Sequence, residues 1–218
     1  MRAQTGAVIL AAGAGRRMGG VAKPLIARDG EALLLRQVRL LAEAEVQNVV
    51  VVLGYYAMQV SAILEKTRWS SAASPLARVA LRWTINPDPD AGTASSLRCG
   101  LKRLPPELDE TLVMLGDQPL LETDDVRALL AAWDQRAAGT ELLLPQHEGV
   151  PGHPLVFGDA LRQAVLAGGS VPSWRKQHAE QVQKLPVPHV RCTTDVDTPD
   201  SLVQLQARYD IRLELPRS

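Results

Sequence analysis

The glycine-rich segment from Gly13 to Gly20 limits the fold more than any other part of the sequence. It directly follows an apolar run, Val8-Ile9-Leu10, that predicts a buried strand. Glycines let backbone N–H groups approach an anion closely, and Arg16, Arg17 and Lys23 add three cationic side chains beside them. The sequence therefore predicts a sheet whose first strand ends at a polyphosphate.

Two familiar glycine loops do not match this segment. The dinucleotide fingerprint G-x-G-x-x-G could begin at Gly13 and Gly15, but Met18 stands where a small residue is needed for close packing of helix against strand. The P-loop needs Gly-Lys-Ser/Thr, whereas Lys23 lies between an alanine and a proline. We therefore expect a phosphate-binding loop of another kind.

Composition indicates a single α/β domain that spans residues 1–218. The chain is 46% hydrophobic and 22% charged, which suits one sizeable core. Its formal net charge of zero argues against bulk binding to nucleic acid or to a membrane, so we expect a small partner. The start of the chain has no apolar region of signal type, and no run approaches the roughly 18 apolar residues of a membrane span. We expect a soluble, cytoplasmic protein.

The two cysteines indicate a reducing compartment. Cys99 and Cys192 lie far apart and do not form a C-x-x-C pattern, which argues against a zinc site or a disulfide framework. We expect both to be small core residues.

Short apolar runs alternate with helical patterns along the chain. Such alternation predicts a mostly parallel sheet with helices on both faces. We expect a surface connection between Lys66 and Ala80, with Trp69 its only aromatic residue. The expected strands are Ala7–Ala11, Val49–Leu53, Leu112–Leu115 and Leu142–Leu144, and the expected helices include Leu33–Ala44, Met58–Lys66 and 123–137.

Two helix starts carry capping signals. Thr123 precedes two aspartates and is expected to cap the helix that begins there, with Gly139 as its stop. Near the C-terminus, Thr198 precedes Pro199, which can occupy the first position of a helix.

Carboxylates follow the later strands. Asp117 comes directly after Leu112–Leu115, and Asp195 and Asp197 would point the same way in an extended segment. Mg²⁺ takes one or two protein carboxylates together with phosphate oxygens, so one aspartate from each loop would suffice. The residues alone leave open a plain alternative, in which Asp117 is a turn residue and the other two lie at a solvated helix entry.

Two further loops have functional and structural interpretations. Thr93, Ser95 and Ser96 lie at the entry to a helix, where one hydroxyl would serve as a cap and three suggest contact with a base or a phosphate. His153 lies in a loop held by prolines and glycines and could act as a base, contact a phosphate or simply pack. By itself His153 favours packing, and Arg175 favours a solvated helix face.

Taken together, these segments resemble the MobA-like nucleotidyltransferases, and specifically the molybdenum cofactor cytidylyltransferases. The resemblance runs in family order from residue 10 to about residue 202. It is carried by Leu10-Ala11-Ala12-Gly13, Arg17-Met18-Gly19 with Lys23, Gly92 with Ser95-Ser96-Leu97 and Gly100-Leu101, Gly116-Asp117-Gln118-Pro119, Gly152-His153-Pro154, and Asp195–Pro199.

The resemblance implies a Rossmann-like nucleotidyltransferase fold, with a mostly parallel central sheet of about seven strands and helices on both faces. It implies a Mg²⁺-dependent enzyme, in which Mn²⁺ can substitute. The reaction would transfer CMP from CTP to molybdopterin that carries molybdenum, giving molybdopterin cytosine dinucleotide and pyrophosphate. The implied protein partner is a molybdenum hydroxylase or its maturation chaperone.

The resemblance also implies a role for particular residues. The catalytic set is Arg17, Lys23 and Asp117, and the metal ligands are Asp117 and Asp197, preferred over Asp195 because it directly precedes Thr-Pro. The implied acceptor side is Gly152, His153, Pro154 and Arg175. The implied nucleotide-binding residues are Leu10, Ala11, Ala12, Gly13, Gly15, Arg17, Lys23, Ser95, Ser96 and Gly116.

The resemblance implies the base choice through three features of the sequence. Relatives that transfer GMP carry Leu-Ala-Gly-Gly where this chain has Leu-Ala-Ala-Gly, so Ala12 favours CTP; a single methyl group discriminates by only about 1–3 kcal/mol. Ser96 matches a serine that contacts the base in cytidylyltransferases. The aspartates before Thr198 agree, because GMP-transferring relatives tend to have asparagines there.

The chain departs from the family pattern in three places. Gly15 replaces a common serine, segment 66–80 is longer than relatives need, and residues 170–174 differ from the usual lead into Arg175. The acceptor is therefore less constrained than the donor. The alternatives are a nucleotidyltransferase that uses GTP or a sugar phosphate, and a non-catalytic chaperone that binds the molybdenum cofactor; an oxidoreductase on the same scaffold is disfavoured by the failed fingerprint.

Overall fold

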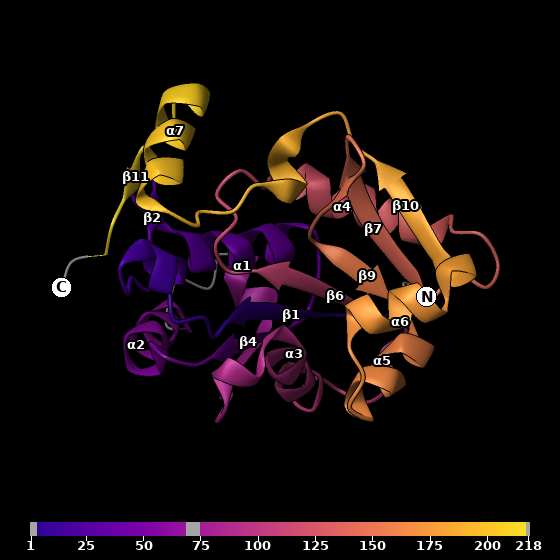
Figure 1. Cartoon of the computed structure of the whole chain (residues 1–218). Helices are drawn as coiled ribbons and strands as arrows, with labels where there is room; N and C mark the ends of the chain where they lie inside the picture. Colours follow the sequence, from indigo (N-terminus) through magenta and orange to yellow (C-terminus); the bar gives the residue numbers. More distant parts are fainter. Residues whose placement is uncertain (1–3, 69–74, 217–218) are drawn as a thin grey trace.

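The central sheet dominates the computed structural model, which describes residues 4–68 and 75–216. Its strands run in the order β10-β7-β9-β6-β1-β4-β5, and β8 pairs with β7 at the side of this path (Figure 1). The strands are β1 (Thr5–Ala11), β4 (Asn48–Leu53), β5 (Ala80–Ile85), β6 (Glu110–Leu115), β7 (Leu142–His147), β8 (Val150–Pro151), β9 (Leu155–Phe157) and β10 (Val182–Pro186).

Most of these strands are parallel. β1 pairs in parallel with both β4 and β6, and β4 pairs in parallel with β5. Only β9 runs against its neighbours β6 and β7 in the seven-strand path, and β10 is again parallel to β7. The expected mostly parallel sheet of about seven strands is confirmed, and the parallel strands bring their carboxyl ends to one edge.

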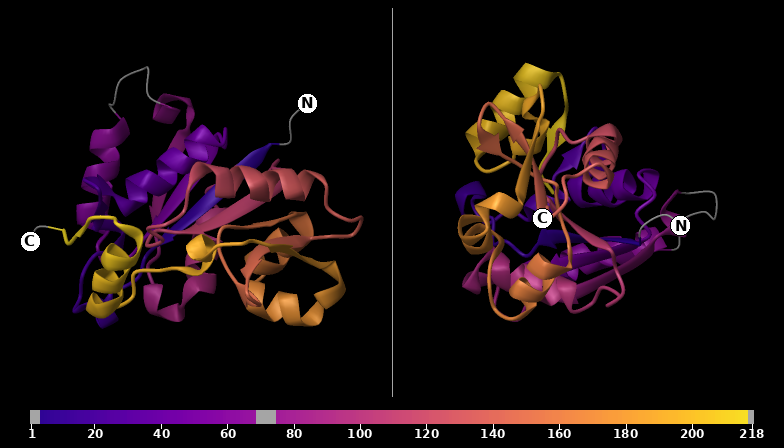
Figure 2. Two further views of the ribbon diagram at one scale, coloured as in Figure 1. Left: turned by 90° about the horizontal axis from the view of Figure 1, so that it is seen from above. Right: turned by 90° about the vertical axis from the view of Figure 1, so that its right-hand side faces the viewer.

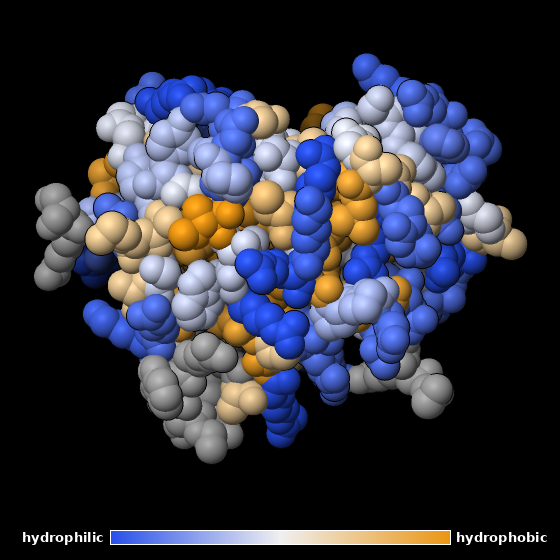
Figure 3. All heavy atoms as spheres, turned by 90° about the horizontal axis from the view of Figure 1, so that it is seen from below, coloured by the Kyte–Doolittle hydropathy of each residue, from blue (hydrophilic) through white to orange (hydrophobic). Residues whose placement is uncertain are grey.

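Helices cover both faces of the sheet. Figure 1 shows α1 and α4 on one side and α3 and α5 on the other, and Figure 3 shows the face on the side of α3 and α5, where hydrophobic residues lie among hydrophilic ones. The helices are α1 (Leu33–Glu43), α2 (Ala57–Arg68), α3 (Thr93–Leu101), α4 (Thr123–Asp134), α5 (Asp159–Leu166), α6 (Val171–Gln177) and α7 (Pro199–Tyr209). None of the helices in the described ranges has the length and hydropathy needed to span a membrane.

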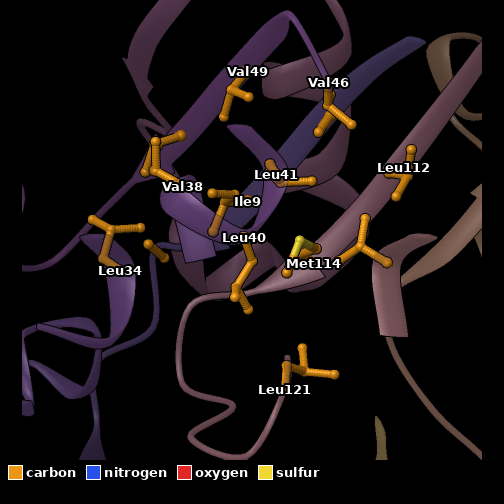
Figure 4. Packing of buried hydrophobic residues seen from close by; sticks show 14 of the residues in the cluster. Ile9, Leu34, Val38, Leu40, Leu41, Val46, Val49, Leu112, Met114 and Leu121 are labelled. Atoms are coloured by element: carbon orange, nitrogen blue, oxygen red, sulfur yellow. The ribbon is translucent and has the colours of Figure 1, made fainter. Parts of the chain in front are cut away.

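The two faces have separate apolar cores because side chains alternate along each strand. Ile9 of β1 packs in a cluster with α1, α2 and α4 residues, part of which is shown in Figure 4. Val8 points the other way, into a cluster with Leu97 and Leu101 of α3. Cys99 packs partly buried against this second cluster and Cys192 is buried, as expected for small core residues.

A second, smaller sheet was not expected from the sequence. It is antiparallel and joins β11 (Leu213–Glu214) to β2 (Ala27–Arg28) and β2 to β3 (Glu31–Ala32). In Figures 1 and 2, β11 and α7, drawn in yellow, lie together at one end of the molecule. Strands of two residues leave no hydrophobic period to recognise, which is why the sequence pattern missed them.

One predicted helix cap is wrong and another is confirmed. Glu122, not Thr123, caps α4, because its carboxylate accepts from the third helical residue while the Asp125 side chain accepts from the Glu122 N–H at 2.9 Å. The helix ends at Asp134, before the expected stop at Gly139. Thr198 does cap α7, with Pro199 as the first helical residue. In the expected connection 66–80, Trp69 lies outside the described residues.

We predict that Gly100→Ala destabilises the fold. A Cβ at this α3 position would lie 2.5 Å from Val8 Cγ1 and 2.9 Å from Val52 Cγ2, both on buried β-branched side chains. Overpacking costs about 1–3 kcal/mol, which exceeds the gain of about 1 kcal/mol from the better helix former. We expect a net loss of about 1 kcal/mol, and at most about 2 kcal/mol, in the free energy of unfolding, measured by urea denaturation.

The control is Gly13→Ala, because a Cβ at Gly13 would meet no atom within 4 Å. We expect its free energy of unfolding to stay within about 0.5 kcal/mol of the parent. Equal stability of the two variants would contradict the close packing of α3 against β1.

Candidate active site

The glycine-rich segment forms a tight turn directly after β1. Gly15 and Gly19 flank one 3₁₀ turn, Arg16–Met18, and both have left-handed backbones with φ of 60° and 72°. Met18 is only 4% exposed and packs with residues of α1, α7 and β11. The methionine that breaks the dinucleotide fingerprint is therefore the anchor of this turn.

The structure explains why a glycine stands at position 15. A Cβ there would lie 2.0 Å from the Val21 carbonyl oxygen, and its positive φ disfavours any larger residue. The serine found in many cytidylyltransferases would not fit this turn. The departure at Gly15 thus agrees with the backbone conformation of this turn.

Two tyrosines hold this turn from the loop after β4. The Tyr56 hydroxyl lies 2.9 Å from the Ala14 carbonyl oxygen and also contacts the Gly20 carbonyl, so it bridges the two ends of the segment. Arg16 reaches the Tyr55 hydroxyl at 3.1 Å and Asp90 at 2.9 Å. The sequence analysis did not select these tyrosines, although inspecting the loop after Val49–Leu53, like the loops after the other strands, would have found them.

Lys23 joins the two predicted metal ligands. Its ammonium lies 2.9 Å from Asp197 Oδ1 and also contacts Asp117 Oδ2. Burial alone would lower the pKa of Lys23, but the charges and hydrogen bonds of both aspartates outweigh it and raise the pKa. Arg17, which is largely exposed, reaches Asp197 at 3.0 Å. The structure thus brings together all four residues that the sequence assigned to catalysis or metal binding.

Asp195 is a further carboxylate close to Lys23, Asp117 and Asp197. Its Oδ1 is buried and has no hydrogen-bond partner among the described residues. Burial, together with the nearby charges of Asp117 and Asp197, raises the pKa of Asp195 to about 6. Of the two carboxylates in this segment, Asp197 is the one that contacts the cationic side chains.

Backbone contacts hold the loops of the cluster at the end of the sheet. The Gly116 N–H donates to the Leu10 carbonyl at 3.0 Å, which continues the β1–β6 pairing one residue beyond the end of β6. The Val196 N–H donates to the Asp117 carbonyl at 3.0 Å and ties the C-terminal segment to the loop after β6. The two aspartate loops are therefore positioned by main-chain bonds as well as by Lys23.

Ser95 and Ser96 lie in the first turn of α3, near the end of β5. Gly92 is the N-cap of this helix, and no side chain caps it, so the interpretation of a hydroxyl as a simple cap is wrong. Both serines instead bond to Asn86, which directly follows β5 and is 2% exposed. Ala12 is also nearly covered and belongs to the core cluster that includes Leu97. Its role in base choice stays a prediction.

An apolar cavity of about 260 Å³ lies between α3, α6 and the loop before β9. Its walls are mostly aliphatic and include Leu10 at the end of β1, while Gly152, His153 and Arg175 also line it. Arg175 is therefore not on a plain solvated face, as the residue alone suggested. Pro154 lines a separate cavity on the side of α4, so it does not join the other three predicted acceptor residues there.

The surroundings of the His153 ring keep it neutral. Burial among the aliphatic side chains of the cavity lowers the pKa of His153 to about 4. The backbone N–H of this residue donates to the Cys192 carbonyl at 2.8 Å, which fixes the loop. A neutral imidazole at pH 7 can donate one hydrogen bond and accept another, but it adds no positive charge for a phosphate.

The fold and this site define the class of protein. A mostly parallel sheet with a glycine turn after its first strand, a lysine between two aspartates and a neighbouring cavity constitute an α/β domain of nucleotidyltransferase type. Residues 7–192 match the MobA-like NTP transferase domain, and the chain belongs to this family.

Known proteins support this assignment. The bifunctional protein GlmU of Mycobacterium ulcerans is 32% identical over 147 residues, which cover 65% of this chain and 28% of that protein. This chain thus spans less than a third of that relative's length. The crystal structure of Rv0371c from Mycobacterium tuberculosis superposes with a TM-score of 0.72 at 23% identity, over 95% of this chain and all of that one.

Two further structures were solved with ligands. A complex of Rv0371c with manganese superposes with a TM-score of 0.67 at 23% identity, over 94% of this chain and 99% of that one. The CMP:2-keto-3-deoxy-manno-octonic acid synthetase, solved with CTP, superposes with a TM-score of 0.68 at 15% identity, over 95% of this chain and 98% of that one. At these identities, both share the fold with this chain.

We predict that Tyr56→Phe loosens the glycine turn. The variant keeps the ring but loses the hydroxyl that bridges Ala14 and Gly20, a hydrogen bond worth about 1 kcal/mol. Amide hydrogens of residues 14–20 should exchange roughly five- to tenfold faster, measured by hydrogen exchange and mass spectrometry. The control Tyr209→Phe on α7 should leave this exchange unchanged. Equal exchange in both variants would contradict a role of the Tyr56 hydroxyl in holding the turn.

We predict that the His153 imidazole does not titrate between pH 8 and about 5.5 in the folded protein. The folded pKa of about 4 lies below the ordinary value near 6.5, so protonation opposes folding. This contribution to stability is complete above pH 6.5 and is lost as the pH falls toward 4. NMR of the ring, assigned with His153→Asn, measures it; in urea the same signal should titrate near 6.5, and a folded pKa near 6.5 would contradict burial.

Proposed function

We propose that the chain is a cytidylyltransferase that transfers CMP from CTP to molybdopterin carrying molybdenum and releases pyrophosphate. The observation that carries this proposal is the arrangement of Lys23 between Asp117 and Asp197, with the glycine turn on one side and the apolar cavity nearby. Such a site offers one place for a triphosphate and another for an acceptor. Family membership and the CTP-bound synthetase of the same fold support the choice of reaction.

The donor side would bind the triphosphate through backbone and cationic groups. Amides from Ala12 to Gly19 and the Arg17 guanidinium would hold the triphosphate, and Lys23 would offset charge that develops around the α-phosphate. The nucleophile is a phosphate oxygen that is already ionised near neutral pH. The chain therefore needs no strong base, and positioning and charge neutralisation supply the catalysis.

The two aspartates fit a divalent cation. Asp117 and Asp197 already converge on one cationic atom, the Lys23 nitrogen, and Oδ1 of the neighbouring Asp195 is buried without a hydrogen-bond partner among the described residues. Within residues 4–68 and 75–216, no group of three or more His, Cys, Asp or Glu side chains forms a complete metal cage. Two carboxylates plus phosphate oxygens suit Mg²⁺, which would neutralise phosphate charge, and the manganese complex of Rv0371c supports a divalent ion.

The acceptor side suits a phosphate monoester with a flat ring system. The aliphatic walls of the cavity offer few hydrogen-bond partners, so a fused heteroaromatic ring would be bound better than a body covered with hydroxyls. Arg175 supplies the cation for the acceptor phosphate, and neutral His153 supplies one hydrogen bond to the ring. This chemistry favours molybdopterin over a sugar phosphate.

Incubation of purified protein with CTP, Mg²⁺ and molybdopterin tests the proposal, with identification of the pterin nucleotide that is released. Formation of molybdopterin cytosine dinucleotide and pyrophosphate is the expected result. Faster transfer from GTP, or transfer to a sugar phosphate instead of the pterin, would assign the alternative reactions. Binding of molybdenum cofactor without any transfer would indicate the non-catalytic chaperone.

We predict that Asp117→Asn lowers turnover at least roughly a hundredfold, because it removes a carboxylate from the metal and from Lys23. The matched control is Asp124→Asn, an 85%-exposed aspartate on α4 that should keep full turnover. Steady-state pyrophosphate release at saturating Mg²⁺ measures both, with circular dichroism to confirm folding. Full activity in a folded Asp117→Asn protein would exclude Asp117 from the reaction.

A further inference from the structure

The carbonyl oxygen of Cys192 joins the loop after β6 to the loop before β9. The Gln118 side-chain nitrogen donates to this oxygen at 2.9 Å, and the His153 backbone N–H donates to it at 2.8 Å. A carbonyl oxygen has two lone pairs, so these two donors use both. Gln118 directly follows Asp117, and His153 lines the apolar cavity. One main-chain atom therefore connects the aspartate cluster to the cavity.

The backbone around this oxygen is closely packed. A Cβ at Gly152 would overlap the Cys192 carbonyl oxygen, so only a glycine lets the loop before β9 approach this closely. Cys192 itself is buried. Because no free space separates the two segments, a displacement of the Cys192 carbonyl also displaces Gly152 and His153.

The Gln118 side chain has one possible orientation. The Cys192 carbonyl can only accept, so the Gln118 atom that meets it is the amide nitrogen. The amide oxygen is then buried without a hydrogen-bond partner among the described residues, on a side chain that is 1% exposed. A methionine of similar length would fill this space without an unpaired oxygen. Stability alone therefore does not account for a glutamine at this position.

The main chain on either side of this link is held from α1 and β2. Gln37 of α1 is completely buried and donates to the Gln118 carbonyl at 2.6 Å. Arg28 of β2 donates to the Pro119 carbonyl at 2.7 Å. Because the main chain is fixed at Gln118, its side chain has little freedom to move relative to Asp117.

We propose that Gln118 is a positioning residue that sets the distance and orientation between the aspartate cluster and the acceptor cavity. The inference rests on the proposed function in one respect, that Asp117 lies on the donor side and the His153 loop on the acceptor side. Nucleotidyl transfer needs the attacking oxygen in line with the α-phosphate, and a displacement of about 1 Å can cost about a hundredfold in rate. At 1% exposed, Gln118 cannot touch a substrate, so it acts through the Cys192 carbonyl.

Gln118→Met tests this role, because methionine has a similar length and cannot donate. The Cys192 carbonyl keeps its bond from His153, so the melting temperature should stay within about 4 °C of the parent. We expect kcat for CMP transfer to fall at least roughly tenfold, while the Kd of CTP in the presence of Mg²⁺ stays within about twofold. A residue that only supports the fold would lower the melting temperature and leave kcat per folded molecule unchanged.

The matched control is Gln183→Met on β10. Its side-chain oxygen accepts from the Ala137 N–H at 3.1 Å, in the connection between α4 and β7. This variant also exchanges a glutamine hydrogen bond for a methionine, but the bond does not join the two sides of the site. We expect it to keep the parent kcat.

A second readout follows the cavity directly and needs no acceptor. Mg²⁺ with pyrophosphate is the probe, because it has no ring that would shift nearby NMR signals. Its binding should shift the backbone amide signal of His153 in the parent protein. In Gln118→Met the probe should still bind, and the shift at His153 should be lost. This readout tests the inference even where molybdopterin is the wrong acceptor.

Three results would overturn the inference and leave nucleotidyl transfer intact: a folded Gln118→Met protein with the parent kcat, the same variant with the parent shift at His153, or a parent protein that binds the probe without that shift. If Gln118→Met fails to fold, Gln118→Asn decides the question, because its shorter amide keeps the polarity but does not reach Cys192. A folded parent that binds neither CTP nor pyrophosphate would instead contradict the proposed function.

Discussion

The parallel pairing of β1 with β4 and β6 is the constraint on which the site depends. Parallel strands end at the same edge, so three loops distant in sequence emerge side by side: the glycine turn, the Tyr55-Tyr56 loop and the loop that carries Asp117. The bond from Gly116 to Leu10 extends this alignment past the end of β6. Without the shared edge, Tyr56 would not reach the glycine turn, and Lys23 would not contact Asp117.

Charge within the cluster is balanced by contacts between these loops. Lys23, which follows the glycine-rich region, contacts Asp117 in the loop after β6 and Asp197 in the segment before α7. The C-terminal part of the chain therefore completes a site that begins in the N-terminal part. The Val196 N–H bond to Asp117 holds this segment in place. The small sheet of β2, β3 and β11 packs at the same end, which accounts for the burial of Met18 and Val196 in one cluster.

For each predicted element or residue, a physical reason explains why the prediction was right or wrong. The strands β1, β4, β6 and β7 and the helices α1, α2 and α4 followed from their hydrophobic periods, and the cap at Thr198 followed from local chemistry. The cap at Thr123 was wrong, because Glu122 and Asp125 satisfy the helix start reciprocally. Arg175 by itself gave no reason to expect a cavity, since a lone cation on a helix has no partner in sequence to define its surroundings.

The sequence by itself determined the α/β class, the positions of β1, β4, β6 and β7 and of several helices, and the identity of the charged residues beyond the strand ends, because these depend on local periodicity and on short motifs. Only the tertiary structure decided which side chains meet. The bridge from Lys23 to two aspartates, the hold of Tyr56 on the glycine turn and the amide of Asn86 between two serines join different loops. The first two contacts join residues at least 36 positions apart in the sequence. Their geometry depends on strand pairing that no local pattern encodes.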